Sequence, residues 1–401
     1  MRNNRLAEVT LAGIGHSGYF PRGKSPDPDF RLILKALFAA CEDAGISPKQ
    51  LDGLSSYCGP PTDPRRVAAA IGMKELKFAG LQWASGGGGT SAAFANAAAA
   101  IIAGYCDCVA VIRSVKMDEG TRYGQFGGGY GGGGVETVSG YGFRGVDKAP
   151  YGVLSSASTL AFQAQMLVEN KGIDPAVFSA VSRASYYHAQ NNPDALMYGR
   201  PLDAATYDDA RKIAEPYRLY DCCLENDGAC AVILTRSDIA KDLKQKPVHM
   251  LSVGETMEFR ADAGAFNWPD FCSAGFRALA PRLYEQAGVG PQDVDVVQIY
   301  ENFIHGVAMT FAEFGLCTYE DMNEVLTFEN LIAPSGKLPL NTSGGNLAEA
   351  YVLGMGHVLE GVRQLRGTSK NQVLGAEVCL VTAGPLTPMT GAMILGTGDV
   401  R

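Results

Sequence analysis

Three segments of the chain carry residue types that could do chemistry. Four glycines at 86–89 follow Trp83-Ala-Ser, an apolar strand-like run ends in YEN at 300–302, and the polar stretch LNTSGGN at 340–346 leads to Tyr351. Glycines ahead of a helix let backbone N–H groups approach an oxyanion, and a phenol or carboxylate at a strand end can move a proton. Each segment also has a plain structural interpretation, as a turn or as the rim of the core.

Several common catalytic motifs are absent from the sequence. There is no P-loop, the pair Gly13 and Gly15 lacks the third glycine of a dinucleotide fingerprint, and no G-x-S-x-G elbow occurs. The histidines show neither the H-x-H nor the H-E-x-x-H spacing of metal sites; they lie at 16, 188, 249, 305 and 357. We therefore expect no metal in this chain, no dinucleotide and no serine nucleophile.

The composition narrows the function classes further. The 401 residues have a formal net charge of −8 and no cluster of lysine or arginine, which argues against nucleic acid as a partner. No apolar run reaches the roughly 18 residues that could cross a membrane, and the N-terminus lacks the apolar core of a signal peptide. The ten cysteines include no C-x-x-C pair, so we expect neither a zinc ribbon nor a disulfide framework. The expected location is the reducing cytoplasm.

The elements that must position these segments repeat within the chain. Residues 41–54 (CEDAGISPKQLDGL) and 284–297 (YEQAGVGPQDVDVV) share identical residues at a constant offset of 243. In both copies an amphipathic helix ends at a glycine, and a proline-containing turn and an acidic residue lead into a strand. The repeat therefore predicts a duplication. The identical positions are Glu42, Ala44, Gly45, Pro48 and Asp52, which recur as Glu285, Ala287, Gly288, Pro291 and Asp295.

Helix-like and strand-like segments alternate along the chain, as in a layered α/β domain. The alanine-rich segment 92–103, for example, favours a helix. We expect an N-terminal half over 1–245 and a C-terminal half over 246–401, with an insertion over about 120–220 in the first. Part of that insertion, GGGYGGGG at 127–134, is too rich in glycine for a regular helix. It either covers a site or is a surface loop.

The chain resembles the thiolase superfamily nearly end to end, in its sterol-carrier-protein-x or lipid-transfer-protein type. Within it, the chain is similar to the thiolase-like aldolases that cleave steroid side chains. The resemblance rests on the AEDAG-like repeat, on NDGACA at 226–231, and on NTSGG at 341–345 followed by GHVLE at 356–360. It implies an α/β thiolase fold, with two duplicated βαβαβαββ halves in a five-layered α/β/α/β/α body and a loop-rich insertion.

The sequence departs from the thiolase pattern at the residues that do the chemistry. Trp83 stands where the family has a nucleophilic cysteine, and Tyr300 and Tyr351 stand in its His-Asp-x-Phe (or Asn-Glu-x-Phe) segment and its glycine-rich histidine segment. The second catalytic cysteine, in a Cys-x-Gly, is missing from VTAGP at 381–385. Thiolysis needs a thiolate to form an acyl-enzyme and a base to activate free CoA. We therefore expect a reaction with proton transfers and no covalent intermediate.

The reaction that the resemblance implies is retro-aldol cleavage of a β-hydroxyacyl-CoA. A steroid or bile-acid side chain is the expected substrate, with a ketone and a short acyl-CoA such as propionyl-CoA as products. One of Tyr300 and Tyr351 would take the proton of the β-hydroxyl, and the other would protonate the enolate carbon. An unperturbed tyrosine has a pKa of about 10, so Glu301 or His305 is expected to help orient one of them. Glu301 could instead be a structural carboxylate.

Further groups complete the predicted site. Backbone N–H groups around Gly344 and Gly345, or in the turn with Ser85 and Gly86, would stabilise the enolate oxygen, and Trp83 would form a wall for an apolar ring system. Two other functions stay open: a non-catalytic thiolase-fold protein that binds an acyl-CoA or lipid, and a thiolase-like acyltransferase. Tyrosine at both site positions favours the aldolase, because random loss of the catalytic residues would leave unrelated ones.

The resemblance implies partners as well. Thiolase-fold proteins pack as dimers, and the aldolase relatives work with a small zinc-ribbon/OB-fold subunit that binds the acyl-CoA. We therefore expect a homodimer and such a second subunit, with any zinc held by that subunit. CoA enters as part of the substrate, and no other cofactor is expected in this chain.

Overall fold

The computed structural model describes residues 5–58, 63–82, 86–117, 149–153, 155–258, 272–387 and 389–398. Within them, the main sheet is mixed and has nine strands in the order β3-β2-β4-β7-β1-β8-β11-β10-β9, and β5 and β6 form a small separate sheet. The strands are β1 (Val9–Pro21), β2 (Gly53–Tyr57), β3 (Phe78–Gln82), β4 (Cys108–Val115), β5 (Lys212–Ala214), β6 (Tyr217–Arg218), β7 (Asn226–Arg236), β8 (Val248–Thr256), β9 (Val296–Gln298), β10 (Val378–Ala383) and β11 (Thr390–Gly396).

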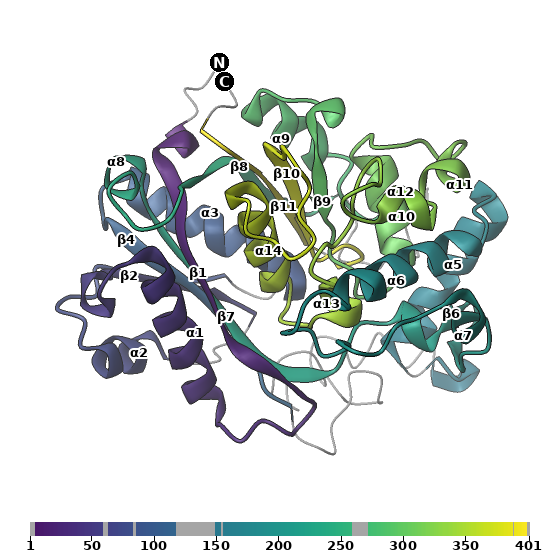
Figure 1. Cartoon of the computed structure of the whole chain (residues 1–401), viewed down its shortest axis with the longest axis horizontal. Coiled ribbons are helices and arrows are strands. Elements are labelled where there is room, and N and C mark those ends of the chain that lie inside the picture. The colour runs from purple at the N-terminus through teal and green to yellow at the C-terminus, as the bar shows by residue number, and fades with distance from the viewer. Residues whose placement is uncertain are drawn as a thin grey trace.

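The helices surround this sheet and also pass between its two halves (Figure 1). The longer ones are α1 (Asp29–Ala44), α2 (Pro64–Ile71), α3 (Gly89–Ile102), α5 (Ser156–Lys171), α6 (Ala176–Ala189), α9 (Leu279–Ala287), α10 (His305–Glu313) and α14 (Met355–Arg366). The short ones are α7 (Ala204–Asp208), α8 (Ser237–Ala240), α11 (Met322–Val325), α12 (Phe328–Leu331) and α13 (Gly345–Ala348).

The main sheet consists of two halves with the same strand order, except that β3 at the edge of the first half has no counterpart among the described strands of the second. In the first, β2 and β4 are parallel, and β4 pairs with β7, and β7 with β1, antiparallel. In the second, β9 and β10 are parallel, and β10 pairs with β11, and β11 with β8, antiparallel. The halves meet where β1 pairs with β8, through Thr10 opposite His249 and Leu11 opposite Val248. This confirms the predicted duplication, whereas the exact boundary between 245 and 246 stays a prediction.

Two aspartates of the sequence repeat hold equivalent positions in the two halves. The carboxylate of Asp52 accepts hydrogen bonds from the backbone N–H groups of Asp107 (3.1 Å) and Cys108 (2.8 Å), at the start of β4. The carboxylate of Asp295 accepts them from residues 377 (2.8 Å) and 378 (2.9 Å), at the start of β10. Each aspartate precedes one parallel strand and ties it to its neighbour. The repeated acidic residue is therefore structural.

The helices form layers on both sides of each half-sheet. α1 contacts β1, β4 and β7, and α9 contacts β8 and β11. α3 contacts strands of both halves, including β2, β4, β8 and β11, and α14 likewise contacts β9 and β10 as well as β1 and β7. α3 tolerates this position because its sequence, GTSAAFANAAAAII, is small and largely apolar on all sides. The layers are those of the predicted body, although pairing of β1 with β8 makes the sheet continuous.

The described part of the predicted insertion is largely helical. α5 begins after Ser155, whose hydroxyl accepts the backbone N–H of Ser158 (3.1 Å), and it ends at Gly172 in the left-handed conformation. α5 contacts α10, and α6 contacts α12 and α13, so these helices pack against the second half at the right of Figure 1. The sequence predicted a loop-rich insertion, and helices α5 and α6 were not predicted. The glycine-rich run at 127–134 lies outside the described residues.

Candidate active site

The phenol groups of Tyr300 and Tyr351 meet inside the protein. Their hydroxyl oxygens are 2.8 Å apart, and their rings meet edge to face with centroids 5.9 Å apart. Tyr300 is 1% exposed and Tyr351 is fully buried. A tyrosine hydroxyl both donates and accepts, so either member of the pair can donate to the other. The structure therefore brings the two tyrosines together in a geometry through which a proton can pass.

Each tyrosine is fixed through its backbone. Tyr300 follows β9, and its N–H donates to the hydroxyl of Thr382 on β10 (3.2 Å). Tyr351 lies between α13 and α14, where Asn226 at the start of β7 binds both of its backbone groups. The side-chain oxygen of Asn226 accepts the N–H of Tyr351 (2.7 Å), and its amide donates to the Tyr351 carbonyl (3.3 Å). Thr382 lies in the VTAGP segment, where a thiolase would carry a cysteine.

The glycine-rich turn before α3 packs directly against the phenol pair. A Cβ on Gly87 would lie 2.3 Å from the hydroxyl oxygen of Tyr300. In the first turn of α3, the hydroxyl of Thr90 donates to the carbonyl of Leu353 (2.6 Å), two residues after Tyr351. The turn belongs to the first half of the chain and both tyrosines belong to the second. The site therefore forms only when the two halves are together.

Glu301 is a fully buried carboxylate with two different contacts. Its Oε1 accepts the backbone N–H of Asn346 (2.9 Å), and its Oε2 lies 2.9 Å from Nε2 of His357. This contact is a close approach of the two side chains rather than an aligned hydrogen bond. The imidazole ring also packs against Tyr300, with centroids 6.2 Å apart. Glu301 thus connects the segment after Tyr300 to the segments on both sides of Tyr351.

His305 does not share these contacts. Its Nδ1 lies 2.6 Å from the hydroxyl oxygen of Tyr217, and its Nε2 lies 3.4 Å from the side-chain oxygen of Gln163. Burial lowers the pKa of His305 to about 3, which keeps the imidazole neutral at physiological pH. Its closeness to Tyr300 in sequence suggested an orienting role that these contacts do not support. α10 begins at His305, and the ring faces residues of the insertion.

Of the two glycines predicted to stabilise an enolate oxygen, one has its N–H engaged. The N–H of Gly344 donates to the carbonyl of Asn341 (2.9 Å). The N–H of Gly345 has a long contact of 3.5 Å with the hydroxyl of Ser343, and a Cβ on Gly345 would lie 2.0 Å from Oε1 of Glu301. Gly344 therefore cannot serve as a donor in this conformation, whereas Gly345 keeps a weakly engaged N–H.

The glycine-rich turn is described only in part. Trp83 and Ser85, predicted as a wall and as part of an oxyanion turn, lie outside the described residues. Gly86 opens the 3-10 turn Gly86–Gly88 with a φ of 51°, in the left-handed region that favours glycine. Their predicted roles stay predictions.

The thiols near the site are poor nucleophiles. Cys223, whose backbone N–H donates to the carbonyl of Asn302 (3.1 Å), and Cys379 on β10 both have pKa values raised well above the ordinary thiol value by burial. The thiolate is the reactive form, so an uncharged buried thiol is inert. All ten cysteines of the chain are free. The geometry thus offers phenols rather than thiolates at the site.

Glu349 is a buried carboxyl two residues before Tyr351. Burial raises its pKa to about 7, against the opposing effect of Arg363, whose guanidinium lies 3.6 Å away. The hydroxyl of Ser343 and the amide of Asn192 donate to its carboxylate at 2.6 and 3.2 Å. These three neighbours also line a polar cavity of about 390 Å³.

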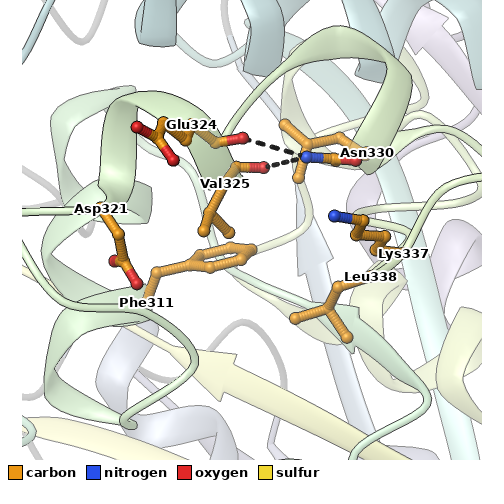
Figure 2. A pocket seen from close by; sticks show the side chains of 8 residues that line it. Phe311, Asp321, Glu324, Val325, Asn330, Lys337 and Leu338 are labelled. Atoms are coloured by element: carbon orange, nitrogen blue, oxygen red, sulfur yellow. Dashed lines mark hydrogen bonds between the residues drawn. The ribbon is translucent and has the colours of Figure 1, made fainter.

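A second cavity, of about 190 Å³, lies in the second half of the chain (Figure 2). Phe311, Val325 and Leu338 give it an apolar side, and the amide of Asn330 donates to the carbonyls of Glu324 and Val325, both at 3.1 Å. Neither this cavity nor the polar one is lined by the phenol pair.

Metal ligands do not gather at the site or elsewhere in the described ranges, where no three or more His, Cys, Asp or Glu side chains are grouped so as to hold a metal ion. None of the described helices is long and apolar enough to span a bilayer.

Three residues at the site were not singled out in the sequence: His357, Asn226 and Gly87. His357 and Asn226 both lie in the stretches that mark the family resemblance, 356–360 and 226–231. That position was the available signal, because residues that carry a resemblance also tend to surround a site. Gly87 belongs to the glycine-rich segment that the sequence did mark, but nothing distinguished it there, since any of the four consecutive glycines could make the close approach.

Comparison with known proteins identifies the family. A family model described as "Thiolase C-terminal domain-like" matches residues 261–397. The 17-hydroxy-3-oxo-4-pregnene-20-carboxyl-CoA lyase of Mycobacterium tuberculosis is 35% identical over 398 residues, covering 97% of this chain and 99% of the relative. The chain belongs to the thiolase superfamily. The steroid side-chain-cleaving aldolase of Thermomonospora curvata, a second member, is 31% identical and covers 97% of each chain.

Solved structures of the superfamily have the same fold. The "Ltp2-ChsH2(DUF35) aldolase" superposes with a TM-score of 0.88 at 28% identity, covering 98% of each chain. Human mitochondrial 3-ketoacyl-CoA thiolase superposes with a TM-score of 0.71 at 15% identity, covering 98% of this chain and 100% of the other. The predicted family, thiolase fold and enzyme class, a carbon–carbon lyase of the aldolase type, are thereby confirmed.

Proposed function

We propose that this thiolase-superfamily lyase cleaves a β-hydroxyacyl-CoA with a steroid or bile-acid skeleton by a retro-aldol reaction. The products are a ketone and a short acyl-CoA such as propionyl-CoA. The observation that carries the proposal is the buried contact of 2.8 Å between the hydroxyls of Tyr300 and Tyr351, in a site without a reactive thiolate.

The names of the relatives support this substrate class. The compound named for the Mycobacterium tuberculosis relative carries a hydroxyl on steroid carbon 17 and a CoA thioester on the carboxyl attached to carbon 20. That hydroxyl is β to the thioester carbonyl, which is the arrangement a retro-aldol reaction requires. Breaking the bond between carbons 17 and 20 of such a compound leaves a ketone on the ring and a three-carbon acyl-CoA.

The reaction balances with two proton transfers and no other reagent. One tyrosine, in its phenolate form, takes the proton of the β-hydroxyl as the electrons of that O–H bond form the ketone. The bond between the α and β carbons breaks, and its electron pair passes into the thioester enolate. The enolate carbon then takes a proton from the tyrosine pair, which restores the starting state. An oxyanion on one tyrosine would be stabilised by a hydrogen bond from the other hydroxyl.

The oxygen of the enolate also needs a donor. Of the two predicted donors, Gly344 and Gly345, only Gly345 has an N–H that could donate to the enolate oxygen, because its one contact in this conformation is long. Both phenols are buried, so part of their cover must move for the substrate to enter. We assign Glu301 to positioning, because its two contacts reach the segments on either side of Tyr351.

We further propose that the chain works as a homodimer in the cytoplasm with a small acyl-CoA-binding subunit of zinc-ribbon/OB-fold type. The similar structure "Ltp2-ChsH2(DUF35) aldolase" carries the names of two components, one of them marked as DUF35, which supports a second subunit. Any zinc would belong to that subunit, because no C-x-x-C pair occurs in this sequence.

The deciding experiment incubates the protein, alone and co-expressed with a candidate partner subunit, with a panel of β-hydroxyacyl-CoA thioesters. Mass spectrometry then follows the ketone and the shortened acyl-CoA. We expect both products in equal amounts from a 17-hydroxysteroid thioester, and none from the analogue without the hydroxyl. Tight binding of the thioesters without products would instead favour a non-catalytic binding protein, and transfer of the acyl group to an added thiol would favour an acyltransferase.

A further inference from the structure

Glu301 contacts the chain on both sides of Tyr351. One carboxylate oxygen binds the backbone of Asn346, and the other lies beside the imidazole of His357, each at 2.9 Å. These two residues flank Tyr351 in sequence, and Glu301 itself directly follows Tyr300. A single carboxylate therefore links the segments that carry the two phenols.

The packing around Glu301 leaves it little freedom. Gly345 has no side chain where a Cβ would lie 2.0 Å from Oε1, and a positive φ of 58° favours glycine there in any case. His357 is 1% exposed and its ring packs against the Tyr300 ring, so it cannot turn away into solvent. Movement of His357 would consequently change its contacts with both Glu301 and Tyr300.

The same residues hold buried polar atoms without an aligned hydrogen-bond partner in the described structure. These atoms are Oε2 of Glu301, both ring nitrogens of His357 and the side-chain amide nitrogen of Asn346. Buried polar atoms are satisfied in the great majority of cases, and exceptions that cluster at one place point to function. Here the cluster adjoins the phenol pair, because the His357 ring packs against the Tyr300 ring.

We propose that His357 is a positioning residue for the tyrosine pair, acting through Glu301 and through its packing on Tyr300. This rests on the proposed function, since the effect is on proton transfer by the two phenols. The imidazole holds the Glu301 carboxylate, which in turn fixes the separation of the two hydroxyl oxygens. His357 is not one of the residues that stand at thiolase catalytic positions, namely Trp83, Tyr300 and Tyr351. It lies in the first turn of α14, after Tyr351.

The test compares His357→Leu with His357→Gln, which keeps a nitrogen donor. We expect His357→Leu to lower kcat about 100-fold with KM within about threefold, as for a misplaced catalytic group, and His357→Gln to recover at least about tenfold of that loss. His249→Leu, at a partly exposed histidine on β8, is the matched control and should keep the wild-type kcat. An unchanged kcat in His357→Leu would overturn the proposal.

Two further measurements separate a positioning role from general damage. The double variant His357→Leu/Tyr300→Phe should be no slower than Tyr300→Phe alone, because both changes remove the same proton transfer; fully multiplied losses would contradict the proposal. A crystal structure of His357→Leu should show the two hydroxyl oxygens beyond hydrogen-bond distance, and a retained separation of 2.8 Å would also refute it. The crystallographic result holds even if wild-type protein cleaves no thioester, which would be a failure of the proposed function alone.

Discussion

The hydroxyl oxygens of Tyr300 and Tyr351 lie 2.8 Å apart, although Tyr300 follows strand β9 and Tyr351 lies between helices α13 and α14. Their backbones are anchored on different elements, by Thr382 on β10 and by Asn226 at the start of β7. Such a pair can take one proton from a substrate and return one to it. This is what a retro-aldol cleavage needs when no thiolate is present.

The first prediction concerns the phenols themselves. Tyr300→Phe and Tyr351→Phe each remove one hydroxyl from the pair, and each should lower kcat by about 10²–10⁴-fold, the usual contribution of a general acid or base. The free energy of unfolding should fall by only about 1–3 kcal/mol, because one buried hydrogen bond is lost. Steady-state kinetics and chemical denaturation measure the two effects. Wild-type rates in both variants would refute the assignment.

A second prediction uses the close approach of the glycine-rich turn. In Gly87→Ala the new methyl group would lie 2.3 Å from the hydroxyl oxygen of Tyr300, so either the phenol or the turn must shift. We expect kcat to fall about 100-fold, since a displacement near 1 Å at a catalytic group has effects of that size. Gly356→Ala is the matched control: its Cβ would meet Oε2 of Glu349 at an ordinary 3.6 Å. If both variants kept full activity, the turn would not belong to the site.

A third prediction concerns the pH dependence of stability. Burial raises the pKa of Glu349 to about 7 from a reference value of 4.5, so the folded protein favours the protonated carboxyl. The unfolded chain loses this proton first, and folding stability should therefore decrease as pH rises from 4.5 to 7. The contribution is on the order of 3 kcal/mol.

Glu349→Gln should remove this pH dependence, because the amide is neutral and of nearly the same shape. The measurement is the free energy of unfolding of both proteins between about pH 4.5 and 8, and the difference between them isolates Glu349 from other titrating groups. Arg363 keeps a second partner in the variant, since Glu360 lies 3.4 Å from it. Parallel stability curves for the two proteins would show that Glu349 does not titrate in this range.

A fourth prediction tests the two aspartates of the repeat. Asp52→Ala and Asp295→Ala each remove the acceptor of two backbone N–H groups, so each should reduce the free energy of unfolding by about 1–3 kcal/mol. KM and kcat should change little, because neither residue contacts the phenol pair. Glu377→Ala, at an exposed position that donates only its backbone N–H to Asp295, should have no effect on stability.

Much of the fold was predictable because short sequence patterns mark where helices end and strands begin. The repeated pattern of helix, glycine, proline turn and aspartate gives equivalent structures: α1 and α9 end at Gly45 and Gly288, with φ values of 75° and 73°. α5 and α6 were missed although Ser155 and Gly172 mark the ends of α5. The neighbouring glycine run dominates the composition of the insertion and masks these local helix signals.

Site residues were predictable only where they occupy positions of the family pattern. Tyr300 and Tyr351 could be singled out because they occupy two catalytic positions of the family pattern. His305 suggested a supporting role by adjacency, but a helix begins at that residue and carries its ring toward Tyr217. His357 escaped notice because its contact with Glu301 is long-range and depends on how α14 packs against the end of β9.

The matching strand order of the two halves has a consequence for how such an enzyme could change its chemistry. Every side chain assigned to proton transfer or to its positioning, namely Tyr300, Glu301, Tyr351 and His357, comes from the second copy. The first copy supplies Gly87 and Asn226, which give space and anchorage. With Trp83 in the place of the family's nucleophilic cysteine, the first copy contributes space and anchorage alone, and the reactive groups of the second copy can be exchanged without rebuilding this frame.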